Sequence, residues 1–402
     1  SKCNNWFMNE YNEIRKVCEE NSEIPGKLID EFLIYYAGGR NNLEYKMNQA
    51  FASYKHVTKR FQKEWINRLK AQYIAHRIFK KDGIIQSLME QPPIKDLENN
   101  SREYLEFQAG NPWRFSFSII KANTDENFFI MEDVLSEEEF LLYSPGVKET
   151  LLEKQALLWF NLISFNGKCW QSYGAIGAYS SFEVDDIFFF ATELNHKIED
   201  EQDILESIEN NPIPYMLLLS GSSAPIIFDK DEQLIHSVSE YEIDSIDNKS
   251  LADSFKVENN RDVYRLSLKN WNGPPHFADA FFDEKKHIIL LSSMTDSGFM
   301  ALAEGLNKCG YNFDSEPAIR VNLSMIDTAS EILKRKIILN EYENMFSKEQ
   351  SPEEKEKFEK LNHFLKLLLP DINAGTEPDI EALAAKAGVD IETARSIIEQ
   401  LM

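Results

Sequence analysis

Residues 113–143, which read WRFSFSIIKANTDENFFIMEDVLSEEEFLLY, carry the clearest structural signal in the chain. Apolar side chains alternate with polar ones from Phe115 to Ile119, and two short apolar runs follow at 128–131 and 140–143. A period of two is typical of strands that bury one face. The connections between the runs are short and polar, as expected of hairpin loops. The stretch therefore predicts a small antiparallel meander.

Downstream of the meander, residues 151–325 alternate apolar runs with acidic stretches of helical spacing, which indicates mixed α and β structure. The glycine-rich stretch Trp159–Tyr179 could let a backbone approach a ligand closely, but tight turns are the favoured interpretation. The apolar runs that we predict as strands are Leu157–Ser164, Ile187–Thr192, Tyr215–Leu219, Val263–Leu268 and His287–Ser292.

Residues 1–100 lack this alternation and show the three- and four-residue spacing of apolar side chains that is typical of helices. The main element expected here is one long amphipathic helix between the glycines at 38–39 and the prolines at 92–93. Its buried side would carry Met47, Phe51, Tyr54, Phe61, Trp65, Leu69 and Tyr73.

The C-terminal part predicts a separate helical module. Ser-Pro-Glu-Glu at 351–354 is a capping box, and Pro370 is expected to stop the helix that begins there. Residues 380–401 then resemble a helix-turn-helix with Gly388 in the turn, and ubiquitin-associated domains share a similar pattern. The outward positions, among them Glu392, Arg395 and Glu399, are more acidic than basic. We therefore expect the module to pack on its own chain or on a partner in preference to reading DNA.

These signals together predict an α+β fold with a helical N-terminal region, a central antiparallel β-rich region with helices and a small all-α C-terminal module. The expected domains are residues 1–105 with the long basic helix, residues 106–325 with the strands, and residues 326–402 with the helix-turn-helix-like module. A chain of 402 residues is long enough for several cores.

Charge is distributed unevenly along the chain. The net charge is −24, which disfavours binding of the whole molecule to nucleic acid or anionic lipid. Residues 43–82 nevertheless carry a net charge of +7, which leaves −31 for the remainder. On one face of the predicted long helix the basic residues form a stripe of Lys59, Lys63, Lys70, Arg77 and Lys81. This stripe could cover an acidic part of the same molecule, which we favour, or contact an acidic protein partner or nucleic acid.

Four scattered cysteines, Cys3, Cys18, Cys169 and Cys309, have neither a second cysteine nor a histidine at metal-ligand spacing. We expect small buried thiols in a reducing compartment, with no disulfide framework. The sequence contains neither a long apolar span nor the basic-then-apolar order of an export signal. We therefore expect a bacterial, cytoplasmic protein without membrane contact.

Signatures of catalysis are missing from the sequence. We find no phosphate-binding glycine loop, no His-Glu-x-x-His, no Gly-x-Ser-x-Gly and no dinucleotide fingerprint, so we expect neither a cofactor nor a metal. His276 follows two prolines and could be held rigidly at a loop mouth, although a stiff connection is the favoured interpretation. Asp185 and Asp186 would point to opposite faces of a strand, which favours a solvated surface over a shared metal.

The sequence thus favours a binding or regulatory protein that acts through protein–protein contacts. One alternative is an enzyme whose site is assembled from distant residues of the central region. The other is a nucleic-acid-associated factor that uses the basic helix or the C-terminal module.

Overall fold

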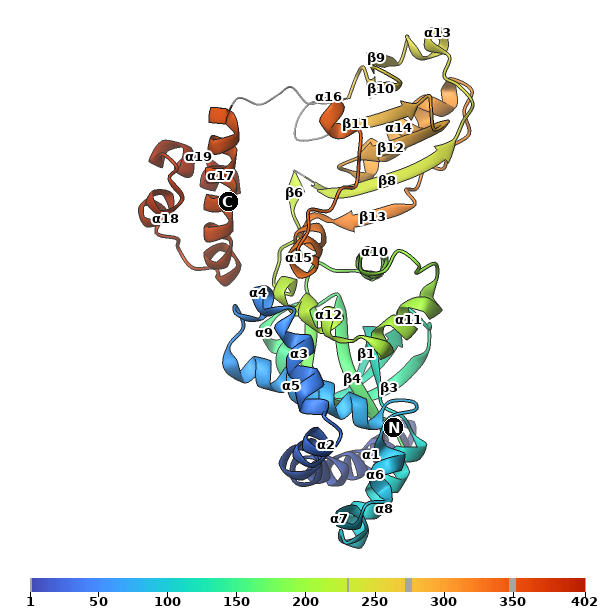
Figure 1. The fold of residues 1–402 in the computed structure, drawn as a ribbon, viewed down its shortest axis with the longest axis vertical. Helices are drawn as coiled ribbons and strands as arrows, with labels where there is room; N and C mark the ends of the chain where they lie inside the picture. Colours follow the sequence, from blue (N-terminus) through green and yellow to red (C-terminus); the bar gives the residue numbers. More distant parts are fainter. Residues whose placement is uncertain (1, 230, 272–276, 347–351, 402) are drawn as a thin grey trace. The chain divides into compact units, whose positions relative to one another are not determined.

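The computed structural model describes residues 2–229, 231–271, 277–346 and 352–401, and their α+β character confirms the predicted fold class. The chain forms two compact units (Figure 1). The first comprises residues 1–236 and 319–337, and the second comprises residues 237–318 and 338–402. His276 lies outside the described residues.

The first unit begins with a helical region. Its helices are α1 (Lys2–Pro25), the π-helix η1 (Gly26–Leu33), α2 (Ile34–Arg40), α3 (Leu43–Ala52), α4 (Lys55–Thr58), α5 (Lys63–Phe79), α6 (Ile85–Met89), α7 (Pro92–Lys95) and α8 (Asn99–Gly110).

The long helix expected between residues 47 and 81 is divided into α3, α4 and α5, so the prediction of a single element is wrong. Gln62 has extended backbone angles before α5 begins. The interruptions let the chain fold back, and Phe51 meets Tyr73 edge-on with 6.2 Å between ring centroids. In one continuous helix these two residues would lie roughly 33 Å apart. Burial of aromatic surface between α3 and α5 therefore outweighs helix continuity.

A five-stranded closed barrel follows, with the strand order β1-β2-β3-β5-β4. All neighbours are antiparallel except β3 and β5. β1 is shared, because its residues 114–118 pair with β4 and residues 118–125 pair with β2. This order, with a helix between β3 and β4, is the topology of the OB-fold. The elements are β1 (Arg114–Asp125), β2 (Phe128–Asp133), β3 (Glu139–Tyr143), α9 (Pro145–Glu153), β4 (Leu158–Phe165) and β5 (Trp170–Tyr179).

The barrel interior holds a mostly apolar core. Val147 of α9 contributes to it together with strand residues that alternate toward the interior, namely Phe129, Met131, Phe140, Leu142, Trp159, Ile163 and Ala178. The predicted meander corresponds to β1, β2 and β3, and the run at 157–164 corresponds to β4.

The first unit is completed by helices and short strands. These are α10 (Val184–Leu194), α11 (Glu201–Asn210), α12 (Ile213–Met216), the 3₁₀-helix η2 (Leu217–Gly221), β6 (Phe228–Asp229), β7 (Glu232–Gln233), β13 (Ile319–Asn322) and α15 (Leu323–Leu333).

Two of the predicted strands in this part are helices. Residues 187–192 belong to α10, which begins with a capping box between Glu183 and Asp186, and residues 215–219 belong to α12 and η2. Both segments are mostly buried, so their apolar runs show no alternation that would separate a helix from a strand. Capping and prolines near the helix starts favour the helical form.

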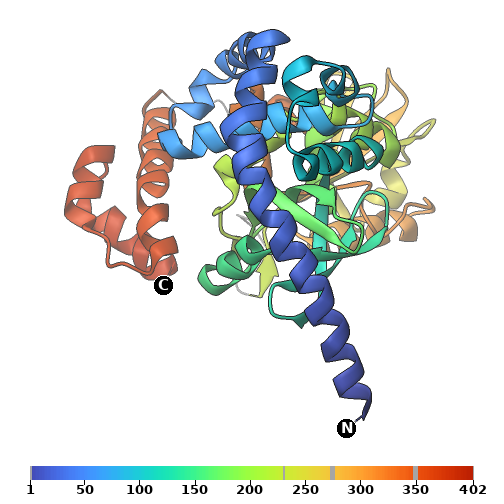
Figure 2. The ribbon, with the colours of Figure 1, turned by 90° about the horizontal axis from the view of Figure 1, so that it is seen from below.

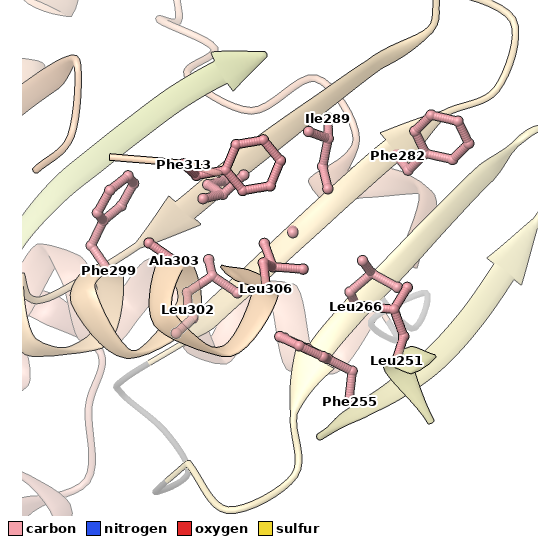
Figure 3. Packing of buried hydrophobic residues seen from close by; sticks show 13 residues of the cluster. Leu251, Phe255, Leu266, Phe282, Ile289, Phe299, Leu302, Ala303, Leu306 and Phe313 are labelled. Carbon is pink, nitrogen blue, oxygen red and sulfur yellow. The ribbon is translucent and has the colours of Figure 1, made fainter. Parts of the chain in front are cut away.

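The second unit contains an antiparallel sheet in which β8, β12, β11, β10 and β9 lie side by side in that order. Its elements are β8 (Ile235–Glu242), α13 (Asn248–Leu251), β9 (Phe255–Asn260), β10 (Val263–Leu268), β11 (Ala278–Asp283), β12 (Ile288–Ser293) and α14 (Asp296–Lys308). Figure 3 shows α14 packed against one face of this sheet, with Phe299, Leu302 and Leu306 pointing at the strands. The predicted strands at 263–268 and 287–292 are therefore confirmed as β10 and β12, within a residue of each end.

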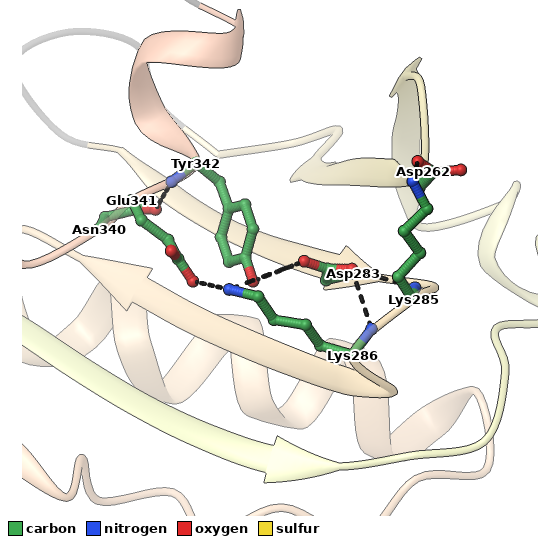
Figure 4. A network of polar contacts seen from close by, with 7 residues as sticks. All are labelled: Asp262, Asp283, Lys285, Lys286, Asn340, Glu341 and Tyr342. Carbon is green, nitrogen blue, oxygen red and sulfur yellow. Dashed lines mark hydrogen bonds and ion pairs between the residues drawn. The ribbon is translucent and has the colours of Figure 1, made fainter.

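The opposite sheet face is covered by the segment that includes α16 (Glu343–Phe346), through a cluster that contains Phe281, Leu290 and Tyr342. Polar contacts secure this segment (Figure 4). The Tyr342 hydroxyl donates to Asp283 Oδ2 over 3.0 Å, and Lys286 Nζ pairs with Glu341 over 2.6 Å.

The C-terminal residues form three helices, α17 (Pro352–Ala374), α18 (Ile380–Ala387) and α19 (Ile391–Leu401). They share a small core that includes Phe364, Leu368, Ala384 and Ala394. Gly388 lies between α18 and α19, where the turn is predicted, in a left-handed conformation with φ of 71°. Pro370 does not stop α17, because a proline removes only one intrahelical bond and packing against two other helices offsets that loss.

Candidate binding site

The helix α1 lies on the barrel face that corresponds in position to the ligand-binding face of OB-folds. That face consists of strands β2 and β3 together with the loops that follow β1 and β4. Figure 2 shows α1 as the long helix that crosses the first unit. Tyr11, Ile14 and Cys18 of α1 pack on barrel residues Phe128, Leu141, Tyr143 and Cys169.

Polar contacts hold α1 at both ends of this face. At the loop after β1, Arg15 pairs with Asp125 over 3.2 Å and donates to the carbonyl oxygen of Glu126 over 3.1 Å. At the other end, the Gln171 amide of β5 donates to the Cys18 carbonyl oxygen over 3.0 Å and to Ser22 Oγ over 2.9 Å. The Asn21 amide donates to Gln171 Oε1 over 2.9 Å.

The π-helix η1 continues directly from α1, and π-helical turns are frequent at functional sites. Two hollows are lined by residues of α1 and η1, and Asn21 contributes to both. We name them the polar recess, of about 610 Å³, and the acidic groove, of about 880 Å³.

The polar recess is lined by η1, α5 and the barrel strands β4 and β5. Its polar side chains include Asp30, Asn67, Arg68, Gln171 and Tyr173. The Tyr173 hydroxyl donates to Asp30 Oδ1. Partial withdrawal from water raises the pKa of Asp30, while the Tyr173 hydrogen bond acts in the opposite direction. The recess can therefore present both hydrogen-bond donors and acceptors to a small polar molecule.

A β-bulge shapes the wall of the polar recess. The pairing of β4 with β5 shifts register between Phe160 and Leu162, and Gly174 opposite this shift has φ of +76°. A side chain at Gly174 would be strained and would approach the Gln72 side chain to 3.2 Å. Gln72 also holds the bulge, because its amide donates to the carbonyl oxygens of Tyr173 and Ala175. Bulges of this kind are over-represented beside functional sites.

The acidic groove runs between the α1–η1 segment and α8. Apolar side chains of both walls line it: Ile24, Leu28, Phe32, Leu97, Tyr104 and Phe107. Four exposed carboxylates, Glu20, Glu23, Glu98 and Glu103, also line it, together with one basic residue, Lys27. Among the described residues, no lysine, arginine or histidine lies within ion-pair distance of these four carboxylates.

The predicted basic stripe is only partly assembled. Lys63, Lys70 and Arg77 lie seven residues apart on α5 and share one face, whereas Lys59 precedes that helix and Lys81 follows it. Arg77 donates to the carbonyl oxygens of Glu209 and Asn210, over 3.2 Å and 2.7 Å. No carboxylate of the described chain pairs with any of the five. Their role in partner binding stays a prediction.

In the C-terminal module, Glu392, Arg395 and Glu399 are exposed on α19. Arg395 lies 3.5 Å from Glu381 of α18, so the one basic member faces a carboxylate of its own module.

Asp186 was expected on a solvated surface, but its side chain is buried. It lies in the first turn of α10 and accepts hydrogen bonds from the backbone N–H groups of Glu183 and Asn322, each over 2.8 Å. The Asn322 amide donates to it over 2.7 Å. Burial raises the pKa of Asp186 to about 6, although these hydrogen bonds act to lower it. Asp186 therefore joins α10 to β13.

The sequence also missed the side chains that line the two hollows. Asn21 and Asp30 lie 150 and 143 residues from their partners Gln171 and Tyr173, and none of the four belongs to a recognisable motif. Cys18 and Cys169 are the buried free thiols that the sequence predicts, but their contact with each other could not be read from their spacing. The alternation of β5 was the one available signal, since it placed Gln171 and Tyr173 on the same face of a strand.

Comparison of the chain with protein-family models, with curated proteins and with solved structures gives no match. Among the described residues, no helix is both long and apolar enough to cross a bilayer. Within the same residues, no group of three or more histidine, cysteine, aspartate or glutamate side chains could hold a metal ion.

Proposed function

We propose that this protein acts by binding a protein partner, and that the acidic groove receives a basic, amphipathic segment of that partner. The observation that carries this proposal is the combination of an apolar lining with four carboxylates that form no ion pair with any described residue. A helix with leucine-like residues on one face and lysine or arginine on its flanks would fit both features.

The apolar lining supplies the contact area for such a helix. Phe107 is 39% exposed, which is unusual for a phenylalanine, and it lies beside Phe165 with 6.5 Å between ring centroids. Tyr104 of the same helix also lines the groove and is almost fully buried. Aromatic side chains that a partner buries are among the residues that contribute most binding energy at protein interfaces.

The groove walls are held in place before any partner arrives. Gln108 of α8 donates to the carbonyl oxygen of Phe165 over 3.1 Å and accepts from Trp113 Nε1 over 2.6 Å. The opposite wall is held by the contacts of α1 with Gln171. A preformed groove spares a partner the cost of ordering it.

The carboxylates would orient a basic partner in the groove and raise the rate at which it associates. Because the whole chain has a net charge of −24, any basic peptide will be attracted to it to some degree. The test must therefore separate local from global attraction, and variants of equal charge change achieve this.

The experiment measures the fluorescence anisotropy of a labelled helical peptide made of leucine and lysine with leucines at helical spacing. Glu23→Lys with Glu103→Lys should weaken binding at least about tenfold, because two exposed charge contacts become repulsive. The matched control, Glu206→Lys with Glu304→Lys, reverses two exposed carboxylates that do not line the groove and should change affinity less than about threefold. Equal weakening by both double variants would show that only the net charge attracts the peptide.

A further inference from the structure

Two cysteines from distant parts of the chain are in contact beneath α1. Cys18 Sγ of α1 lies 3.3 Å from Cys169 Sγ, which belongs to the loop that follows β4. The residues are 151 positions apart, and both side chains are almost fully buried. Both are free thiols. Cys309 provides a contrast, because its thiol donates to the carbonyl oxygen of Ser250 and has no sulfur neighbour among the described residues.

The surroundings of the pair distinguish the two sulfur atoms. Asn166 holds the loop, because its Oδ1 accepts the backbone N–H groups of Lys168 and Cys169, each over 2.9 Å. Its amide donates to Cys18 Sγ over 3.3 Å and lies 3.7 Å from Cys169 Sγ. Hydrogen bonds from Cys169 and Asn166 and the nearby Arg15 charge lower the pKa of Cys18, whereas the hydrogen bond to Cys18 and burial raise that of Cys169.

We propose that Cys18 and Cys169 form a redox-active dithiol, which a small organic disulfide converts into an intramolecular disulfide that fastens α1 to the loop after β4. The Cys18 thiolate attacks one sulfur of the oxidant and releases one thiol. Cys169 then attacks the Cys18 sulfur of the mixed disulfide and releases the second thiol. The two protein thiols lose two electrons and two protons, and the oxidant becomes two thiols.

Little movement is needed for the bond to form. A disulfide requires the sulfur atoms at about 2.05 Å, so they must approach by roughly 1.3 Å, within the reach of side-chain rotation and a small helix shift. Because both thiols are buried, the oxidant reaches them only when α1 opens locally, and the reaction should be slow in the native protein.

The disulfide would limit the movement of α1, which lines both the polar recess and the acidic groove. Asn21, one turn along α1 from Cys18, lines the polar recess and the acidic groove. The oxidised protein therefore holds α1 on the barrel by a covalent bond as well, whereas the reduced protein holds it only by noncovalent contacts. This effect on the groove rests on the proposed function, while disulfide formation itself does not.

The experiment treats the full chain with hydroxyethyl disulfide, blocks remaining thiols with N-ethylmaleimide and maps the peptides without reduction. The expected product is a linked pair of peptides that contain Cys18 and Cys169. Cys18→Ser and Cys169→Ser should each abolish this product, and Cys309→Ser should leave it unchanged. Oxidation should raise the Tm by several degrees, and dithiothreitol should reverse the rise.

Two outcomes would overturn the proposal. One is linkage of Cys18 or Cys169 mainly to Cys3 or Cys309. The other is consumption of the Cys18 and Cys169 thiols by the oxidant without any linkage between them, because slow opening of α1 delays the reaction but does not change its product. Peptide binding to the oxidised and reduced forms is measured separately, so a groove that binds nothing would refute the proposed function and leave the dithiol assignment intact.

Discussion

Replacement of Asp186 by asparagine should remove a pH-dependent part of the stability of the first unit. The pKa of Asp186 is raised from 3.8 in a model peptide to about 6 in the native chain. A native carboxyl that binds its proton more tightly than the unfolded one stabilises the protein at low pH, and this contribution is lost as the pH rises from about 4 to about 6. At 1.36 kcal/mol per pKa unit the full loss is about 3 kcal/mol.

The size of the effect in an accessible range follows from the same two pKa values. Between pH 5 and pH 7 the wild-type chain should lose about 1.3 kcal/mol through Asp186. The side chain introduced by Asp186→Asn does not titrate. The variant replaces one carboxylate oxygen with an amide NH₂ group, which cannot accept the hydrogen bonds from Glu183 and Asn322. Below pH 4 this variant should therefore be less stable than the wild type by about 1 to 3 kcal/mol. This difference in unfolding free energy between wild type and variant, the stability gap, should narrow as the pH rises.

Urea unfolding at pH 5, 6 and 7, followed by tryptophan fluorescence, measures the gap, because the buried Trp113 and Trp159 belong to the same unit. Asp185→Asn is the matched control, since Asp185 is the exposed neighbour, and its curve should run parallel to the wild type. A gap between wild type and Asp186→Asn that stays constant, or widens with pH, would refute the reasoning. It would mean that the hydrogen bonds to Asp186 outweigh its burial.

Two further predictions concern the second unit. Tyr342→Phe should destabilise it by about 1 to 2 kcal/mol and raise the pKa of Asp283, because the hydroxyl is one of the donors that lower that pKa against the effect of burial. Carboxyl NMR titration checks this, and an unchanged Asp283 pKa would argue against it. Leu302→Ala should cost about 2 to 5 kcal/mol, since Leu302 is fully buried between α14 and the sheet. Met300→Ala on the exposed side of the same helix should cost less than about 1 kcal/mol in the same denaturation assay.

The fold class and several strands could be predicted from local pattern alone. The alternation at Phe115–Ile119 and the turn at Gly388 are properties of neighbouring residues, and both are present in the structure. Short apolar runs that are buried on all sides, such as 187–192, carry no alternation, so their helical form depended on capping at Asp186 and on packing. The break between α3 and α5 likewise depended on a contact between Phe51 and Tyr73, which no local period reveals.

The candidate site depended almost entirely on long-range contacts. The segregation of charge could be read from the sequence, and it pointed to the basic residues of 43–82. The structure instead combines apolar lining and charge in the acidic groove. The barrel brings its β4–β5 loop to α1, and thereby brings Cys169 to Cys18 and Gln171 to Asn21. Local sequence determines which faces of a helix or strand are apolar, because that periodicity extends over a few residues. Which faces meet is decided by chain closure over more than a hundred residues, where the free energy of burial selects one arrangement.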